Sequence, residues 1–132
     1  VDFHAILTED TPIGFFKIDR TYGIAKENEL GLRGFMIDRH HQGKGYATQA
    51  VRALAGYVPR HYPQCSSLAL TVDMQNTAAI ACYRMGGFTI TGQTYFGGLF
   101  GPQIVIRMSI SPLAQEGIPK QSAQVPSGVV RA

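Results

Sequence analysis

Residues 42–47 read Gln42-Gly43-Lys44-Gly45-Tyr46-Ala47, and this glycine-rich stretch organises the sequence on either side of it. An apolar segment, residues 30–37, precedes it, and residues with helical apolar spacing follow it. A strand, a glycine-rich turn and a helix start in this order gather backbone N–H groups at the positive end of the helix dipole. Such an array binds phosphate groups. The sequence therefore predicts a site for a phosphorylated ligand at residues 42–47.

The composition is that of one soluble domain. The chain has 132 residues, of which 45% are hydrophobic and 16% charged, and this is enough to bury a core. The formal net charge is +3, and Lys and Arg are scattered, so we expect no nucleic-acid partner. No apolar run is long enough to cross a bilayer and no signal peptide is visible, so we expect no membrane partner. The chain begins at Val1 and not at a methionine, which leaves open whether a piece precedes it.

The cysteines and histidines show no metal-binding pattern. Cys65 and Cys82 form neither a disulfide framework nor a metal-ligand spacing. We expect both thiols to be reduced, in a cytoplasmic protein. The pair His40-His41 is interpreted as a solvated turn, because no Cys or carboxylate spacing supports a metal there. His4 and His61 give no functional signal.

The first part of the chain predicts an antiparallel meander. Its strands are expected at residues 3–7, 13–20 and 30–37. Residues 9–12, Glu-Asp-Thr-Pro, have the composition of a turn. After the glycine-rich stretch, apolar residues recur with helical spacing from Ala47 to Val58. This helix is expected to end near Pro59.

The second part of the chain predicts three more strands around a second helix. These strands are expected at residues 67–72, 88–94 and 104–110. Asn76 or Thr77 can cap a helix that runs to about Met85 and stops at Gly86-Gly87. Residues 111–132 are rich in Pro, Gln, Ser and Gly and are interpreted as a flexible tail or an arm packed on a neighbour. The predicted fold class is α/β, in the form of a mixed α+β sheet whose middle connections run parallel.

Two common phosphate-binding motifs do not fit the glycine-rich stretch. The Walker motif requires a glycine at position 38, which is Asp38, and a Ser or Thr after Lys44, where Gly45 stands. The dinucleotide fingerprint requires a glycine at position 48, which is Thr48. Neither a Walker-type nucleotide site nor a dinucleotide site is therefore predicted.

The remaining pattern, Gln42-x-x-Gly45-x-Ala47, resembles the pyrophosphate loop for acetyl-coenzyme A in the GCN5-related N-acetyltransferase (GNAT) family. That family's loop reads Gln/Arg-x-x-Gly-x-Gly/Ala. A second stretch, Asn76-x-x-Ala79-x-x-Cys82-Tyr83-x-x-x-Gly87-Phe88, is similar to the family's downstream signature. The two motifs stand in the family's order, with room for one helix and one strand between them. The resemblance covers residues 3–108.

The resemblance implies a fold and a cofactor. It implies a GNAT-type twisted sheet in which acetyl-coenzyme A (acetyl-CoA) enters a V-shaped opening between splayed parallel strands, here 30–37 and 67–72. Residues 1–110 would form this acetyl-CoA-binding domain, and 111–132 the tail or arm. The family usually opens with a strand and one or two helices that wall the acceptor site, and this chain begins at what resembles the second strand. A missing N-terminal piece, the C-terminal tail or a partner chain is expected to cover that sheet edge.

The resemblance also assigns residues to the cofactor. The N–H groups of residues 42–47 would face the pyrophosphate, and the end of the first splayed strand would pair with the pantetheine arm. One amide there, of Met36 or Ile37, would polarise the thioester carbonyl. Asn76 would bind the cofactor arm, cap its helix, or do both. The expected cofactor-binding residues are Phe35, Met36, Ile37, Gln42, Gly43, Lys44, Gly45, Tyr46, Ala47 and Asn76.

The same resemblance suggests catalytic residues. Tyr83 matches the family's general acid, which protonates the departing thiolate, and its other interpretation is a core aromatic. Ordinary pKa values of about 8.5 for a thiol and about 10 for a phenol allow that proton transfer. The family's base position falls on Gly31, which has no side chain to act. Glu29, on the same strand face, and Asp73 are the alternative bases, with ordered water as the third alternative.

The leading hypothesis is an N-acetyltransferase that moves an acetyl group from acetyl-CoA to a primary amine by direct attack in a ternary complex. The acceptor would be a small molecule or a protein, and the residues around the glycine-rich stretch are similar to those of bacterial polyamine-type acetyltransferases. The aromatic loop 95–101 would line the amine site or form an oligomer contact, as in a homodimer. The alternative is a non-catalytic acyl-CoA-binding module, which Gly31 and the missing N-terminal elements keep open. A basic nucleic-acid binder ranks last.

Overall fold

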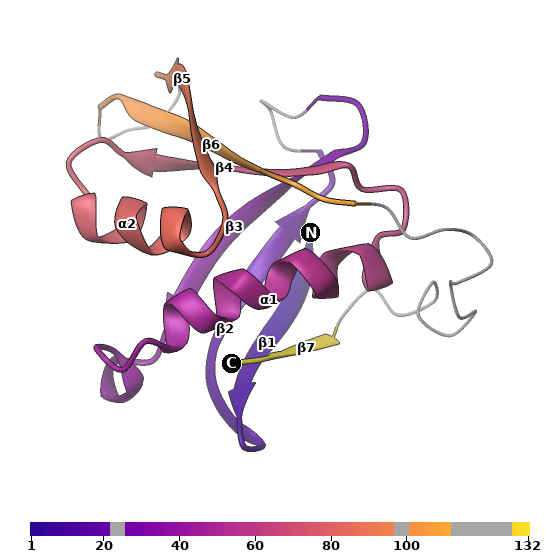
Figure 1. Ribbon diagram of the computed structural model, residues 1–132, viewed down its shortest axis with the longest axis vertical. Coiled ribbons are helices and arrows are strands. Elements are labelled where there is room, and N and C mark those ends of the chain that lie inside the picture. The colour runs from indigo at the N-terminus through magenta and orange to yellow at the C-terminus, as the bar shows by residue number, and fades with distance from the viewer. Residues whose placement is uncertain (22–25, 97–100, 112–127) are drawn as a thin grey trace.

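One seven-stranded mixed sheet joins the parts of the chain that the structure describes, which are residues 1–21, 26–96, 101–111 and 128–132. The structure is a computed structural model, shown in Figure 1. The strand order is β5-β6-β4-β3-β2-β1-β7. Helix α1 runs across the face of the sheet in front of β1 and β2, with α2 packed beside its N-terminal half (Figure 1). The predicted mixed α/β class is confirmed.

Strands β1 (Asp2–Thr8), β2 (Thr11–Asp19) and β3 (Glu29–Ile37) form the predicted antiparallel meander. Glu9 and Asp10 join β1 to β2 with φ angles of 48° and 67°. Two consecutive positive φ angles are typical of a type I′ hairpin turn, whose twist matches that of the strands. The apolar side chains of the meander that face α1 are fully buried: Ile6, Ile13, Phe16 and Ile18.

Helix α1 (Tyr46–His61) begins at the end of the glycine-rich stretch, and its buried face consists of Ala50, Val51, Leu54, Val58 and Pro59. The predicted end near Pro59 is two residues too early. A proline removes one N–H donor and clashes with the preceding turn, so it breaks a helix most strongly in the interior. Pro59 lies in the last turn, and beyond it the N–H of Tyr62 still donates to the carbonyl of Val58 at 2.8 Å.

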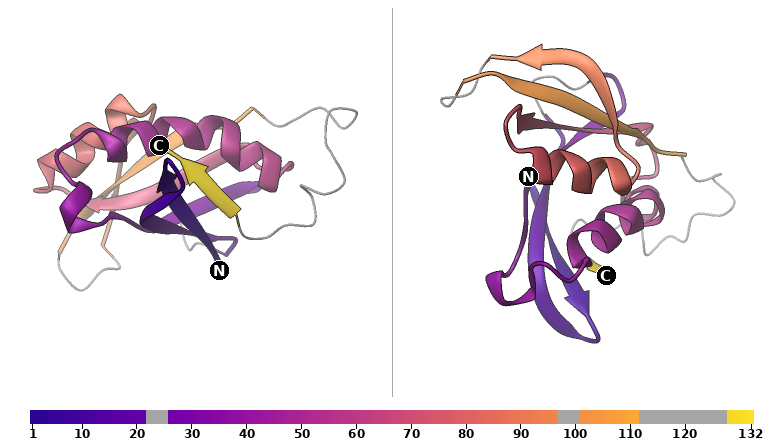
Figure 2. Two further views of the ribbon diagram at one scale, coloured as in Figure 1. Left: turned by 90° about the horizontal axis from the view of Figure 1, so that it is seen from below. Right: turned by 60° about the vertical axis from the view of Figure 1, so that its left-hand side comes forward.

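The second half of the chain contains β4 (Ser67–Asp73), α2 (Thr77–Met85), β5 (Thr89–Tyr95) and β6 (Gln103–Ser109). The Asn76 side chain caps α2 by accepting a hydrogen bond from the Ala79 N–H at 3.2 Å. Gly86 ends the helix at a point of close packing, because a Cβ added there would lie 2.2 Å from Cγ1 of Val51 on α1. Figure 2 shows the strongly twisted sheet from two other directions.

Strand β7 (Gly128–Arg131) pairs in parallel with β1, so the last residues of the chain belong to the sheet. Its Val130 is buried, and Arg131 Nη1 donates to Asp10 Oδ1 at 2.9 Å. The interpretation of the whole segment 111–132 as a tail or arm therefore needs correction at its end, while 112–127 lie outside the described residues. The sheet edge that was expected to need a cover is covered by the chain itself. Neither α-helix of the described parts is long and apolar enough to span a membrane.

Candidate active site

The candidate site opens where the parallel strands β3 and β4 stop pairing. The pairs in register are Glu29–Ser67, Leu30–Leu68 and Gly31–Ala69. Beyond these pairs β3 stays with β2 as far as Ile37, and β4 stays with β6 as far as Asp73. The two strands therefore diverge, and the described part of β3 from Leu32 to Ile37 has no strand on its β4 side. This confirms the predicted splay and leaves backbone groups of β3 facing the opening.

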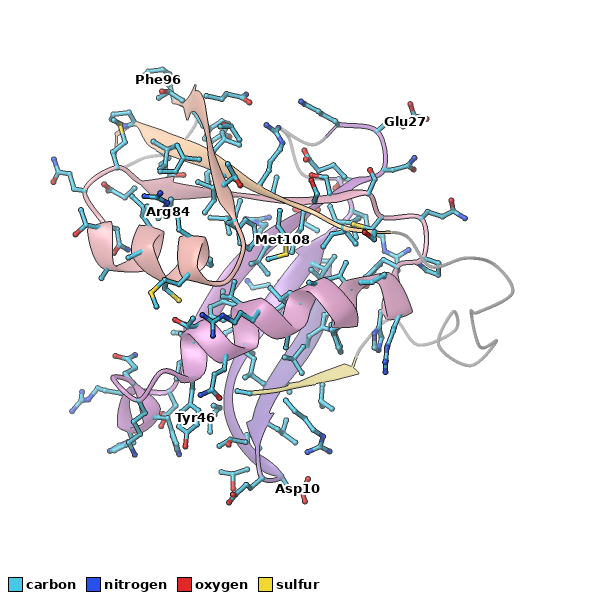
Figure 3. The ribbon with its side chains drawn as sticks, viewed as in Figure 1. Asp10, Glu27, Tyr46, Arg84, Phe96 and Met108 are labelled. Atoms are coloured by element: carbon cyan, nitrogen blue, oxygen red, sulfur yellow. The ribbon has the colours of Figure 1, made fainter. Side chains whose placement is uncertain are left out.

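The glycine-rich stretch lies at the end of β3, after a short 3₁₀ turn, Arg39–His41. Gly43 and Gly45 have φ angles of 74° and 84°, which side chains other than glycine rarely adopt. Gly45 stands at the N-terminus of α1, and no side chain caps this end of the helix. The first N–H groups of α1 are thus available to an anion, in the arrangement that binds phosphate. Tyr46 marks the first residue of α1 in Figure 3.

The turn before the glycines is held by Asp38. Its carboxylate accepts hydrogen bonds from the His40 N–H at 3.1 Å and from His41 Nδ1 at 3.0 Å, and the bond to His41 lowers the pKa of the Asp38 carboxyl. The His40 side chain is largely exposed. The histidine pair therefore shapes a solvated turn, as the sequence predicted.

A first hollow, of about 420 Å³, lies between β3, the glycine-rich stretch and α2. We call it the helix-side hollow; it is lined by Phe35, Met36, Ile37, Gln42, Ala47, Asn76, Ala78, Ala79, Cys82 and Tyr83. Six of the ten expected cofactor residues thus line one space, and the other four, residues 43–46, form the loop at its end. Gln42 Nε2 donates to the carbonyl of Ile37 at 2.9 Å and ties the loop to the end of β3.

A second hollow, of about 280 Å³, occupies the opening between the splayed strands. We call it the strand-side hollow; it is lined by Leu32, Arg33, Gly34, Phe35, Leu70, Thr71, Tyr83 and Gln103. Phe35 and Tyr83 line both hollows, so the two spaces meet at these side chains. Two ligands that enter from different sides could react at this point.

Tyr83 is held at the junction by aromatic contacts. Its ring centroid lies 6.0 Å from that of Phe35 and 5.6 Å from that of Phe88, both in edge-on geometry. The side chain is half-buried on α2, four residues before the glycine at the end of the motif. Packing against two rings restricts the phenol to one place, which is what a residue that delivers a proton requires.

Glu29, one of the two expected bases, lies away from both hollows. Its carboxylate is buried and accepts from Arg107 Nε at 2.8 Å and from Ser67 Oγ at 2.5 Å. Burial raises the pKa of this carboxyl, but the hydrogen bonds from Arg107, Ser67 and the Lys26 N–H outweigh it, so the pKa is lowered overall. Glu29 and Arg107 thus form a structural ion pair outside both hollows, and the paired carboxylate is weakly basic. The expectation that Glu29 acts as the base is therefore corrected.

Asp73, the other expected base, stands at the end of β4 and also shapes a turn. Its Oδ1 accepts from the Gln75 N–H at 2.8 Å. It lines neither hollow, although its register partner on β6, Gln103, lines the strand-side hollow. Asp73 remains a candidate base by its place beside this hollow.

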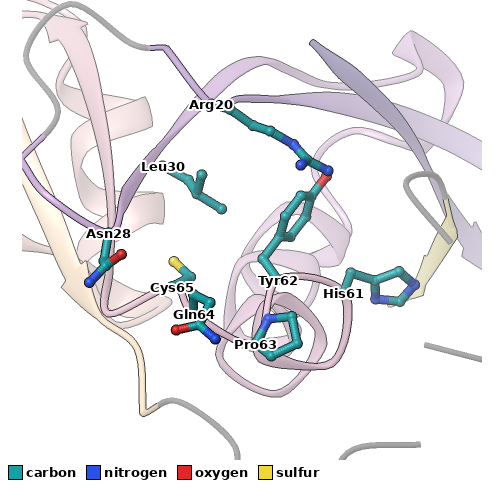
Figure 4. Close-up of a pocket in the computed structure, with 8 residues that line it drawn as sticks. All are labelled: Arg20, Asn28, Leu30, His61, Tyr62, Pro63, Gln64 and Cys65. Atoms are coloured by element: carbon teal, nitrogen blue, oxygen red, sulfur yellow. The ribbon is translucent and has the colours of Figure 1, made fainter. Parts of the chain in front are cut away.

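A third hollow, of about 280 Å³, lies beyond the C-terminal end of α1 and is shown in Figure 4. We call it the distal hollow; it is lined by Arg20, Asn28, Leu30, His61, Tyr62, Pro63, Gln64 and Cys65. The Arg20 guanidinium stacks over the Tyr62 ring at 5.2 Å and pairs with Asp2 at 3.1 Å. Burial raises the pKa of the Cys65 thiol, which keeps it protonated and unreactive. None of the expected site residues lies here.

A network of buried polar side chains, centred on His4, lies beside this hollow, and no sequence pattern indicates it. Its Nδ1 meets the Tyr57 hydroxyl, its Nε2 lies 2.9 Å from the Tyr62 hydroxyl, and that hydroxyl donates to Asp2 at 2.6 Å. Because the Tyr62 proton is used on Asp2, His4 donates from Nε2 and accepts the Tyr57 proton at Nδ1. A neutral imidazole thus satisfies every partner. Burial first, and then the nearby His61, lowers the pKa of His4 to about 4.

This pKa predicts a loss of stability in mild acid. Between pH 6.5 and about 4 the unfolded chain binds a proton at His4 that the folded chain does not, so the free energy of unfolding falls as the pH falls. At about 1.4 kcal/mol per pKa unit, the loss is at most about 3 kcal/mol. Urea denaturation across this range should show a steeper pH dependence for the natural chain than for His4→Gln. His40→Gln, at an exposed site, is the control, and equal slopes for the natural chain and His4→Gln would contradict the assignment.

Comparison with known proteins places this geometry in a family. Residues 2–88 match the acetyltransferase (GNAT) family. An uncharacterized N-acetyltransferase of Bacillus subtilis (strain 168), YbbJ, is 31% identical over 106 residues, which are 76% of this chain and 66% of that protein. A probable spermine N(1)-acetyltransferase of Bacillus subtilis subsp. natto (strain BEST195) is 33% identical over 73 residues, which are 55% of this chain and 47% of that protein.

The fold of a solved structure agrees. An aminoglycoside acetyltransferase in complex with coenzyme A and kanamycin superposes with a TM-score of 0.65 at 20% identity, over 89% of this chain and 66% of the other. The chain thus spans 66% of this enzyme, and 66% and 47% of the two curated relatives. The family match extends over more than half of the chain and includes the glycine-rich stretch, Tyr83 and Phe88. The chain belongs to the GNAT acetyltransferase family.

Proposed function

We propose that this chain transfers the acetyl group of acetyl-CoA to a primary amine, by direct attack in a ternary complex. The observation that carries the proposal is the meeting of two hollows at Phe35 and Tyr83, with the glycine-rich stretch and the uncapped start of α1 at the end of one of them. The helix-side hollow would take acetyl-CoA and the strand-side hollow the amine. The family membership and the coenzyme A complex of the structural relative support this assignment.

The chain's own groups would hold acetyl-CoA at three places. The N–H groups of residues 42–47, at the uncapped N-terminus of α1, would bind the pyrophosphate. The side of β3 that lacks a strand partner would pair with the amides of the pantetheine arm, as an edge strand pairs with an added peptide. The amide of Met36 or Ile37 would donate to the thioester oxygen, where negative charge develops during attack.

Protons would move through Tyr83 and a base on the acceptor side. The Tyr83 phenol would protonate the coenzyme A thiolate as it leaves, because it borders both hollows. The amine must lose a proton before or during attack. Asp73, beside the strand-side hollow, or an ordered water would accept it, because Glu29 lines neither hollow and is paired with Arg107.

The acceptor would be a small-molecule amine or a protein amine. One of the two curated relatives described above is named for spermine, which supports the inclusion of polyamines among the acceptors tested. The aromatic loop 95–101 suggests a homodimer, although residues 97–100 of this loop lie outside the described residues. Phe96, a described residue of the loop, is exposed, so a contact with a second copy of the chain is part of the proposal.

The test is the release of free thiol from acetyl-CoA in the presence of a panel of amines, with the acetylated product identified by mass spectrometry. We expect thiol release that depends on the amine and equals the amount of product. Tight binding of acetyl-CoA without transfer to any amine would contradict the proposal and indicate the non-catalytic acyl-CoA-binding module instead.

A further inference from the structure

We propose that the acceptor amine carries a carboxylate and that Arg33 binds this carboxylate. The inference rests on the proposed function and concerns the strand-side hollow, where the amine would enter. If the inference is correct, the acceptor is an amino acid or a similar acidic amine and not a polycation such as spermidine.

The strand-side hollow has one cationic side chain in its lining, Arg33, and a second one, Lys17, near its lining residue Gly34. Arg33 lines it directly, and its side chain is about half exposed. Lys17 lies against the adjacent Gly34: a Cβ added at Gly34 would be 2.9 Å from Lys17 Cε and 3.6 Å from its Nζ. Arg33 and Lys17 together carry two positive charges against the one negative charge of Asp19, so an anionic group is attracted and a second ammonium group is repelled.

No carboxylate lines this hollow among the residues that the structure describes. Three acidic side chains lie near it, and each already accepts hydrogen bonds. Asp73, the candidate base beside this hollow, accepts from the Gln75 N–H at 2.8 Å. Asp19 accepts from Arg33 at 3.0 Å and also from the N–H and hydroxyl of Thr21. Glu29 is buried against Arg107 and Ser67. A polyamine needs carboxylates for its second and third ammonium groups; the lining of this hollow offers none, and Asp73 alone lies beside it.

The donors that line the hollow suit a carboxylate. The Asp19 pair uses Nη1 of Arg33, so the guanidinium retains N–H groups that point away from Asp19. A planar guanidinium binds a carboxylate through two parallel N–H···O bonds, which a neutral amide cannot match. Gln103 adds an amide to the lining. The hollow can therefore orient an acidic amine with its nitrogen toward Tyr83.

Acetyl transfer to matched pairs of amines tests this inference. Glycine, β-alanine and 4-aminobutyrate are each compared with the carboxamide that has the same carbon chain, and spermidine is included. The carboxamide of glycine has the less basic nitrogen, so a larger fraction of it is unprotonated at neutral pH. A preference for the acid therefore does not come from a larger supply of unprotonated amine. We expect at least one acid to exceed its carboxamide by about tenfold or more in kcat/KM, since a charge-assisted bidentate pair is lost in the carboxamide.

Arg33→Gln is expected to remove this preference, lowering kcat/KM for the acid by about tenfold with little change for the carboxamide. Arg20→Gln is the matched control, because Arg20 pairs with Asp2 at 3.1 Å and is as exposed as Arg33, yet lies at the distal hollow. Transfer that favours spermidine or the carboxamides, or that is unchanged in Arg33→Gln, would overturn the inference while leaving acetyl transfer intact. Absence of transfer to every amine would overturn the proposed function as well.

Discussion

Replacement of Tyr83 by phenylalanine is expected to lower kcat by about 10²-fold while the Kd for acetyl-CoA stays nearly unchanged. Phenylalanine keeps the ring contacts with Phe35 and Phe88 that hold this side chain at the junction of the two hollows. It removes only the hydroxyl, and with it the proton that would neutralise the departing thiolate. Steady-state kinetics with a competent amine and a binding titration with acetyl-CoA measure the two quantities separately.

Tyr57→Phe is the control for this result. The substitution Tyr57→Phe also removes one hydroxyl, but this hydroxyl forms a hydrogen bond with His4 near the C-terminal end of α1. We expect Tyr57→Phe to lower the stability of the fold and to leave kcat near that of the natural chain at a temperature where both are folded. If Tyr83→Phe turned over as fast as the natural chain, Tyr83 would be a packing residue and the proton would come from elsewhere.

Replacement of Gly45 by valine is expected to weaken acetyl-CoA binding by at least about tenfold, which corresponds to about 1.4 kcal/mol. A branched side chain at Gly45 would occupy the space in front of the first N–H groups of α1, where the pyrophosphate would bind. The nearest side-chain atom to an added Cβ is Gln49 Nε2 at 4.0 Å, so the new side chain meets little of the protein itself. Isothermal titration with coenzyme A measures the loss.

A positive φ angle makes valine unfavourable at Gly45 in any case, and this effect needs its own control. Gly92 on β5 has a φ angle of 82°, close to the 84° of Gly45, and an added Cβ there meets nothing within 4 Å. Gly92→Val therefore carries a similar backbone strain away from both hollows. Equal losses of coenzyme A affinity in the two variants would show that strain, and not the blocked loop, explains the effect.

Local patterns explain why much of the fold could be predicted from the sequence. The turn at Glu9 and Asp10, the cap at Asn76 and the stop at Gly86 depend on residues within a few positions of one another. The turn, the cap and the stop need no knowledge of distant contacts. The splay of β3 and β4 was expected from the resemblance to the GNAT family and not from a local pattern.

The parts that could not be predicted depend on distant pairings. Arg107, which removes Glu29 from the site, is 78 residues away in sequence. The hydrogen bond between His4 and Tyr62 joins residues 58 positions apart, and the sequence around either residue does not indicate it. Strand β7 is a short segment whose partner β1 lies at the other end of the chain. Periodicity indicates on which face of a helix or strand a residue lies, but it does not indicate which distant residue its side chain contacts.

Binding of coenzyme A between the glycine-rich stretch and β3 is tested by a titration of the chain with coenzyme A, followed by the chemical shifts of the backbone amides. We expect the largest shifts at residues 42–47 and 35–37, on the loop and on the side of β3 that lacks a strand partner. We expect little change around Arg20, Tyr62 and Cys65 at the distal hollow. Shifts confined to the distal hollow, or no shifts at saturating coenzyme A, would contradict binding at this site.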